Sequence, residues 1–146
     1  TCHGLAHPDL KADDLAKMLG AGHPINTDFE LVKYSQGSVR HRHYPPDIKT
    51  NAEMTPQELA NIYVVGQAAA LVSATEAMSK SGEAKYKEAQ NKRVEIAKAA
   101  LSGISEAAGL LAAPTRQNAL SFVKSVAGKD LTGAIGSKLP AKSDYK

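Results

Sequence analysis

The stretch MTPQELANIYVV, residues 54–65, constrains the fold most, because three signals for the start of a helix fall within four residues. Thr55 is a favoured N-cap residue, Pro56 occupies the first helical position, and Glu58 completes a capping box with the threonine. Apolar or small residues then recur at helical spacing, namely Leu59, Ile62, Tyr63, Gly66, Ala69, Ala70 and Ala77. We therefore expect a long helix that ends near Ser79.

Two more helices are predicted further along the chain. One runs from Glu83 to Ala108 and is ended by Gly109 and Pro114. The next is capped by Thr115 and stopped by Gly128. Turns this short place consecutive helices antiparallel. Small residues such as those at Gly66 and Ala70 allow close helix approach. The expected fold class is mainly α, with a small loop-rich His-containing N-terminal module followed by antiparallel alanine-rich helices.

The first third of the chain has a different character, because it holds the only cysteine and all five histidines. We predict a short helix over 10–19, capped by Asp9, and a loop over 20–26. A second short helix or an irregular segment is predicted for 28–35, with Thr27 and Glu30 as a capping box. A β-hairpin with the extended stretch 38–46 is the alternative.

These patterns divide the chain into an N-terminal module (1–54), a helical hairpin or bundle (55–128) and a polar, loosely held tail (129–146). The apolar residues are mostly alanine and only seven residues are aromatic, so three helices would enclose a thin core. We therefore expect part of the apolar surface to meet a protein partner or a second copy of the chain.

Composition also argues against several classes of function. The net charge is +3 and the basic residues alternate with glutamates, which does not favour nucleic-acid binding. The longest uncharged run, 59–75, is short and contains Asn61 and Gln67, so no transmembrane segment is predicted. No phosphate-binding loop, G-x-S-x-G or H-E-x-x-H motif is present, and an electron carrier or binding protein is favoured over an enzyme.

The N-terminal tetrapeptide Thr1-Cys2-His3-Gly4 resembles the second half of C-x-x-C-H, the attachment motif of c-type haem. MTPQELANIY is similar to the closing helix of class I c-type cytochromes, so the resemblance covers residues 1–66. It implies an electron-transfer protein with haem c on Cys2, His3 as axial iron ligand and Gly4 beside them. The first cysteine of the motif would lie two positions before Thr1. Distal-ligand candidates are His43, His41 and Met54.

A metal ion other than haem iron is a second interpretation. The amine of a free N-terminus, two backbone amides and the His3 imidazole suit Cu(II) or Ni(II) in a square plane. His41 and His43 would point to the same side of an extended segment, as a pair of ligands for zinc does. His3 and His7 would share a face if residues 3–7 were helical.

A lipid anchor is the third interpretation, because a lone cysteine near a processed terminus is where bacterial lipoproteins are acylated. The chain would then be a non-enzymatic cell-envelope lipoprotein or interaction subunit, held to the membrane through Cys2. The haem and lipid interpretations both predict a periplasmic or extracellular location. A cysteine without any role is the remaining alternative.

Overall fold

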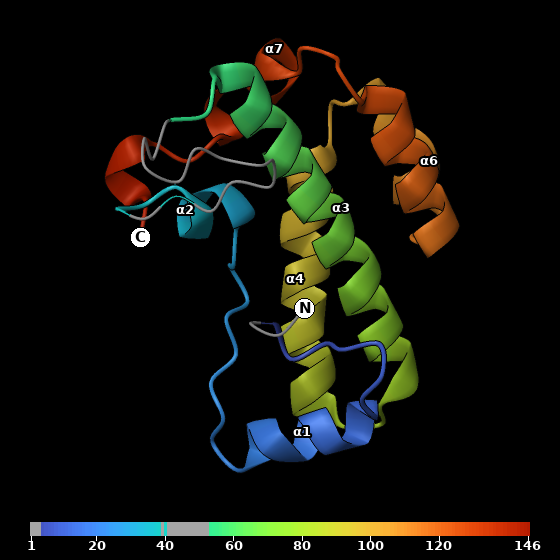
Figure 1. Ribbon diagram of the computed structural model, residues 1–146. Coiled ribbons are helices and arrows are strands. Elements are labelled where there is room, and N and C mark those ends of the chain that lie inside the picture. The colour runs from blue at the N-terminus through green and yellow to red at the C-terminus, as the bar shows by residue number, and fades with distance from the viewer. Residues whose placement is uncertain (1–3, 39, 41–52) are drawn as a thin grey trace.

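The computed structural model describes residues 4–38, 40 and 53–146, and all regular elements in these ranges are helical. The predicted mainly α class is therefore confirmed (Figure 1). The α-helices are α1 (Ala12–Gly20), α2 (Leu31–Ser35), α3 (Pro56–Lys80), α4 (Ala84–Leu101), α5 (Ala108–Ala112), α6 (Arg116–Val126) and α7 (Thr132–Ile135). Three 3-10 turns are η2 (Ser105–Ala107), η3 (Gly136–Lys138) and η4 (Lys142–Asp144).

The antiparallel pair of α3 and α4 forms the centre of the molecule, and the other elements pack around it (Figure 1). The start of α3 has the predicted capping box: Thr55 accepts from the Glu58 amide, and the Glu58 side chain accepts from the Thr55 amide. Leu71 and Leu101 are fully buried where the two helices meet. Because α3 is covered on several sides, its buried residues form more than the single predicted stripe, and Ala69 from that stripe is exposed.

The first two helices begin later than their sequence signals indicated. Lys11, and not Asp9, precedes α1 as its N-cap residue, without a side-chain hydrogen bond. Glu30 is itself the N-cap of α2 and accepts from the amides of Val32 and Lys33, so its predicted capping box with Thr27 is wrong. Gly66 gives the predicted close helix approach, because a Cβ there would lie 2.9 Å from Leu31 Cβ.

The second long helix is shorter than predicted, since α4 ends at Leu101 and does not reach Ala108. Gly103 has a φ of +88°, a left-handed conformation that breaks the helix and that glycine adopts without strain. The chain then continues through η2 and α5 into α6, which begins after Thr115 as predicted. Gln57 donates to the carbonyl of Gly128, so α6 runs antiparallel to α3.

The C-terminal stretch predicted to be a loose tail is tied to the core. Leu131 and Ile135 are buried in the main hydrophobic cluster. Lys138 Nζ donates to the carbonyl oxygens of Ala99 and Ser102 at 3.0 and 2.6 Å, and so caps the C-terminal end of α4. The polar composition of this stretch suggested a loose tail, but Leu131 and Ile135 pack in the core and Lys138 caps a helix.

The N-terminal segment packs against the half of the α3–α4 pair that contains the end of α3 and the start of α4. Leu5, Leu15 and Leu19 form a second hydrophobic cluster there with Ala77 of α3 and Tyr86 of α4.

No helix within the described ranges is both long enough and apolar enough to cross a membrane.

Candidate functional site

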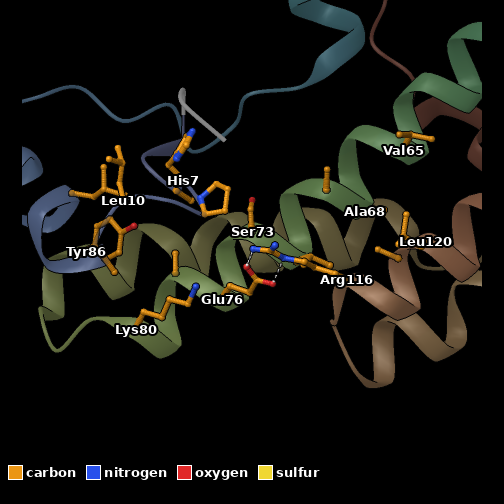
Figure 2. A pocket seen from close by; sticks show the side chains of 18 of the residues that line it. His7, Leu10, Val65, Ala68, Ser73, Glu76, Lys80, Tyr86, Arg116 and Leu120 are labelled. Carbon is orange, nitrogen blue, oxygen red and sulfur yellow. Dashed lines mark hydrogen bonds and ion pairs between the residues drawn. The ribbon is translucent and has the colours of Figure 1, made fainter.

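An open groove of about 410 Å³, lined mainly by apolar side chains, has the character of a binding site, and we call it the α3–α6 groove. Its floor is one face of α3; α6 borders the end at Val65, and the segment from Ala6 to Leu15, which we call the N-terminal wall, borders the end at Lys80 (Figure 2). Its α3 residues are Val65, Ala68, Ala69, Val72, Ser73, Glu76, Ala77 and Lys80; α6 contributes Arg116, Ala119, Leu120 and Val123. The N-terminal wall contributes Ala6, His7, Pro8, Leu10, Ala12 and Leu15, and Tyr86 comes from α4.

Large apolar side chains are left exposed in this groove. Leu10 is 54% exposed, Leu120 57% and Val65 37%, and they come from the N-terminal segment, α6 and α3 respectively. Elsewhere in the described part of the chain, only Met18 and Ile96 are comparably exposed. A contiguous apolar surface in a concave site is a usual mark of a binding site, whereas isolated exposed residues are ordinary.

The charged residues of the groove lie in its middle and at one end. Arg116 donates to both carboxylate oxygens of Glu76, with Nε–Oε1 and Nη2–Oε2 distances of 2.8 and 2.7 Å, which joins α6 to α3. This pairing lowers the pKa of Glu76, so the two side chains neutralise each other. Lys80 makes no ion pair with another described residue. The groove lining therefore carries a net positive charge at the Lys80 end.

His7 lies at the same end of the groove as Tyr86 and Leu10 (Figure 2). Its Nδ1 accepts a hydrogen bond of 3.2 Å from the backbone amide of Asp9. An accepting Nδ1 must hold a lone pair, so the neutral ring carries its proton on Nε2. Metal ligation through Nε2 would require the proton to move to Nδ1 and this hydrogen bond to be given up.

The N-terminal wall is held in place by polar side chains of α4. Gln90 donates to the carbonyl of Gly4 at 2.8 Å, and the Tyr86 hydroxyl donates to the carbonyl of Leu5. Arg93 is 6% exposed and donates to Gln90 Oε1 at 2.6 Å and to Ser73 Oγ at 3.1 Å. Buried hydrogen bonds of this kind fix the backbone from which Ala6 and His7 reach the groove.

The predicted site residues are only partly within the described ranges: Cys2, His3, His41 and His43 lie outside them. Gly4 is buried against α4, His7 lines the α3–α6 groove, and Met54 is buried. Met54 lines a separate pocket of about 270 Å³ with Glu53, Arg40 and Tyr145. Hence His7 and Met54 are not brought into one site. Among the described residues, no group of three or more His, Cys, Asp or Glu side chains is placed to hold a metal ion.

The α3–α6 groove was not predicted, although one signal for it exists in the sequence. Arg116, Ala119, Leu120 and Val123 have the i, i+3, i+4, i+7 spacing of one helix face. Phe122 and Val126 of the same helix are buried, Val123 is partly buried against the core, and Leu120 is exposed. Thus α6 has two apolar faces, one in the core and one that reaches the groove.

Comparisons with known proteins give no relative: no protein-family model matches the chain, and neither the curated proteins nor the solved structures contain a match.

Proposed function

We propose that this chain is a non-enzymatic binding protein that takes up an apolar molecule in the α3–α6 groove. The observation that carries the proposal is the exposure of Leu10, Val65 and Leu120, from three different elements, in one open groove. A volume of about 410 Å³ is within the range of ligand pockets in proteins, which is roughly 300–1,000 Å³. Transfer of an apolar molecule from water to this surface is favourable in proportion to the area covered.

The polar residues of the groove suit binding better than catalysis. Glu76 is neutralised by Arg116, and His7 accepts a backbone amide on Nδ1 with no carboxylate of a described residue hydrogen-bonded to the ring to make it a stronger base. A general acid or base needs a free proton-transfer atom aimed at the substrate, with a second group to orient it. The Glu76–Arg116 pair instead holds two walls of the groove together.

The test is binding of the fluorescent apolar probe N-phenyl-1-naphthylamine. We expect wild-type protein to raise its fluorescence in a saturable manner and Ala69→Trp to abolish that rise, because Ala69 lines the groove and an indole would fill it. Ala99→Trp is the matched control, since Ala99 is exposed on α4 outside the groove. Absence of saturable binding to the wild type, or equal loss in both variants, would contradict the proposal.

A second function, electron transfer by haem c attached to Cys2 with His3 as axial ligand, is favoured by one observation. Gly4 is held against α4 by Gln90, and the groove begins at Ala6, three positions after His3 in the sequence. A covalently held haem requires an apolar surface within reach of its attachment residues. The protein isolated from its source organism should then keep a Soret band after acid–acetone extraction and show the mass of haem on Cys2. A colourless protein of that origin excludes this function, and an acyl mass on Cys2 would indicate a lipoprotein.

A further inference from the structure

The shape of the α3–α6 groove narrows the class of molecule that can fill it. The α3 residues that line it run from Val65 to Lys80, a separation of about 22 Å along a helix that rises 1.5 Å per residue. The groove is therefore long, and it is open to solvent along its length.

Two apolar occupants can be compared with the lining of the groove. A helix from a partner protein is about 10–12 Å across and would lie over the open face of the groove, with no need for a cation at one end. A single hydrocarbon chain is about 4–5 Å wide, since carbon atoms in contact lie about 3.5–4.0 Å apart, and an anionic head group would place one charge at one end of it. A lining that is apolar over most of its length, with a lysine at one end, matches the second occupant.

The distribution of charge gives the occupant a direction. The end of the groove at Val65, Ala68 and Leu120 has no charged side chain in its lining (Figure 2). The other end has Lys80, which makes no ion pair with a described residue. Its charge contributes to the lowered pKa of Glu76, but the Glu76 carboxylate is bound on both oxygens by Arg116, so the three side chains together carry a net charge of about +1. Asp9, next to that end, is itself 84% exposed to solvent. An anionic head group would gain a partner at Lys80 while its tail extends toward Leu120.

We propose that the α3–α6 groove binds a single long-chain fatty acid, with its carboxylate at Lys80 and its chain along α3 toward Val65 and Leu120. An extended chain advances about 1.2 Å per bond, judged from the reach of an extended backbone, so 22 Å corresponds to roughly 18 bonds. Fatty acids of about 16 to 18 carbons match this length. This inference rests on the proposed binding function and adds to it the class of ligand and its orientation.

The experiment is isothermal titration calorimetry with hexadecanoate, hexadecanol and pyrene, each below its solubility limit, on wild-type protein and on Lys80→Gln. We expect one molecule of hexadecanoate per chain, with affinity reduced about two- to fivefold in Lys80→Gln, which is the usual range for a partly exposed ion pair. The affinity for hexadecanol should be the same in both proteins. Lys92→Gln, which removes an exposed lysine of α4 outside the groove, should bind hexadecanoate as the wild type does.

The possible outcomes separate this inference from the proposed function. If the naphthylamine probe binds and hexadecanoate does not, or if pyrene binds at least as tightly as hexadecanoate, the fatty-acid inference fails while the binding function stands. Equal loss of hexadecanoate and hexadecanol affinity in Lys80→Gln overturns the proposed orientation. If neither the probe nor hexadecanoate binds, both proposals fail.

Discussion

The side-chain amide of Gln90 donates a 2.8 Å hydrogen bond to the carbonyl oxygen of Gly4, across 86 positions of sequence. Gln90 is fully buried, and its Oε1 accepts from Arg93, a buried guanidinium that forms no ion pair with a carboxylate of the described residues. Burial lowers the pKa of Arg93, because a charge away from water is unfavourable. This polar cluster fixes the segment that forms the N-terminal wall of the groove.

The clearest consequence concerns Gly4, where a Cβ would overlap the Arg93 guanidinium. Arg93 is held by Gln90 and Ser73, so it cannot move without breaking buried hydrogen bonds. We expect Gly4→Ala to lower the free energy of unfolding by about 1–3 kcal/mol, as overpacking does. Urea denaturation followed by circular dichroism measures the change.

Gly20→Ala is the control for this substitution, because a Cβ at the end of α1 meets open space. We expect it to be neutral or to stabilise by up to about 1 kcal/mol, since alanine is favoured over glycine in a helix. Equal effects of the two substitutions would mean that Gly4 is not packed against Arg93.

Leu120→Gln tests the apolar wall that α6 contributes. Leu120 is 57% exposed, so its replacement should change the free energy of unfolding by no more than about 0.5 kcal/mol. Probe binding should weaken by about 1 kcal/mol, or roughly fivefold, because less apolar surface is covered in the complex. Ile96→Gln changes a similarly exposed residue outside the groove and should leave binding unchanged. Weaker probe binding in Ile96→Gln than in Leu120→Gln would place the site elsewhere.

Glu106 provides a prediction about pH. A 2.6 Å ion pair with Lys129, with its own backbone amide and Ser105 as further donors, lowers the pKa of this carboxyl from 4.5 to about 2. Because the folded-state pKa is the lower one, the stabilisation is present above about pH 4.5 and is lost as the pH falls toward 2. NMR titration of the carboxyl carbon should show the low midpoint, and Lys129→Met should raise it. A midpoint near 4.5 in the wild type would show that the ion pair is absent in solution.

Lys138 caps the C-terminal end of α4 although it is distant from that helix in the sequence. Lys138→Met removes the hydrogen bonds from Nζ to the carbonyl oxygens at the end of α4. The free energy of unfolding should fall by about 0.5–1.5 kcal/mol, the usual contribution of a cation at a helix C-terminus with its hydrogen bonds. Amide hydrogen exchange in the last turn of α4 should become faster. Lys98→Met, an exposed lysine in that turn, should have little effect on either quantity.

The parts of the fold that were predictable are those specified by nearby residues. Thr55, Pro56 and Glu58 determine the start of α3 among themselves, and the capping box is present as expected. The end of α4 was missed, because the alanine-rich sequence to Ala108 favours a helix, whereas Gly103 takes a left-handed φ in the folded chain. The helix propensity of this segment is therefore overridden by the backbone conformation of Gly103.

The candidate site depends on contacts between distant segments, which one sequence does not reveal. Leu131 and Ile135 lie in a mostly polar stretch, so their burial was not predicted. They are buried because the chain after Lys129 returns to the core. Leu10 falls at the start of one predicted helix and Leu120 inside another, and only the packing of the N-terminal segment near one end of α3 and of α6 beside the other part joins them in one groove (Figure 1). Predictions for Cys2 and His3 remain predictions, since those residues lie outside the described ranges.

The most direct test of the account is a ¹H–¹⁵N NMR titration of the uniformly labelled protein with hexadecanoate. We predict saturable shifts confined to the groove, with Ala69, Val72 and Leu120 affected most and Ile96 on the outer face of α4 unchanged. Shifts at Ile96 and along the outer face of α4, or no saturable shift at any residue of the α3–α6 groove, would contradict the central claim.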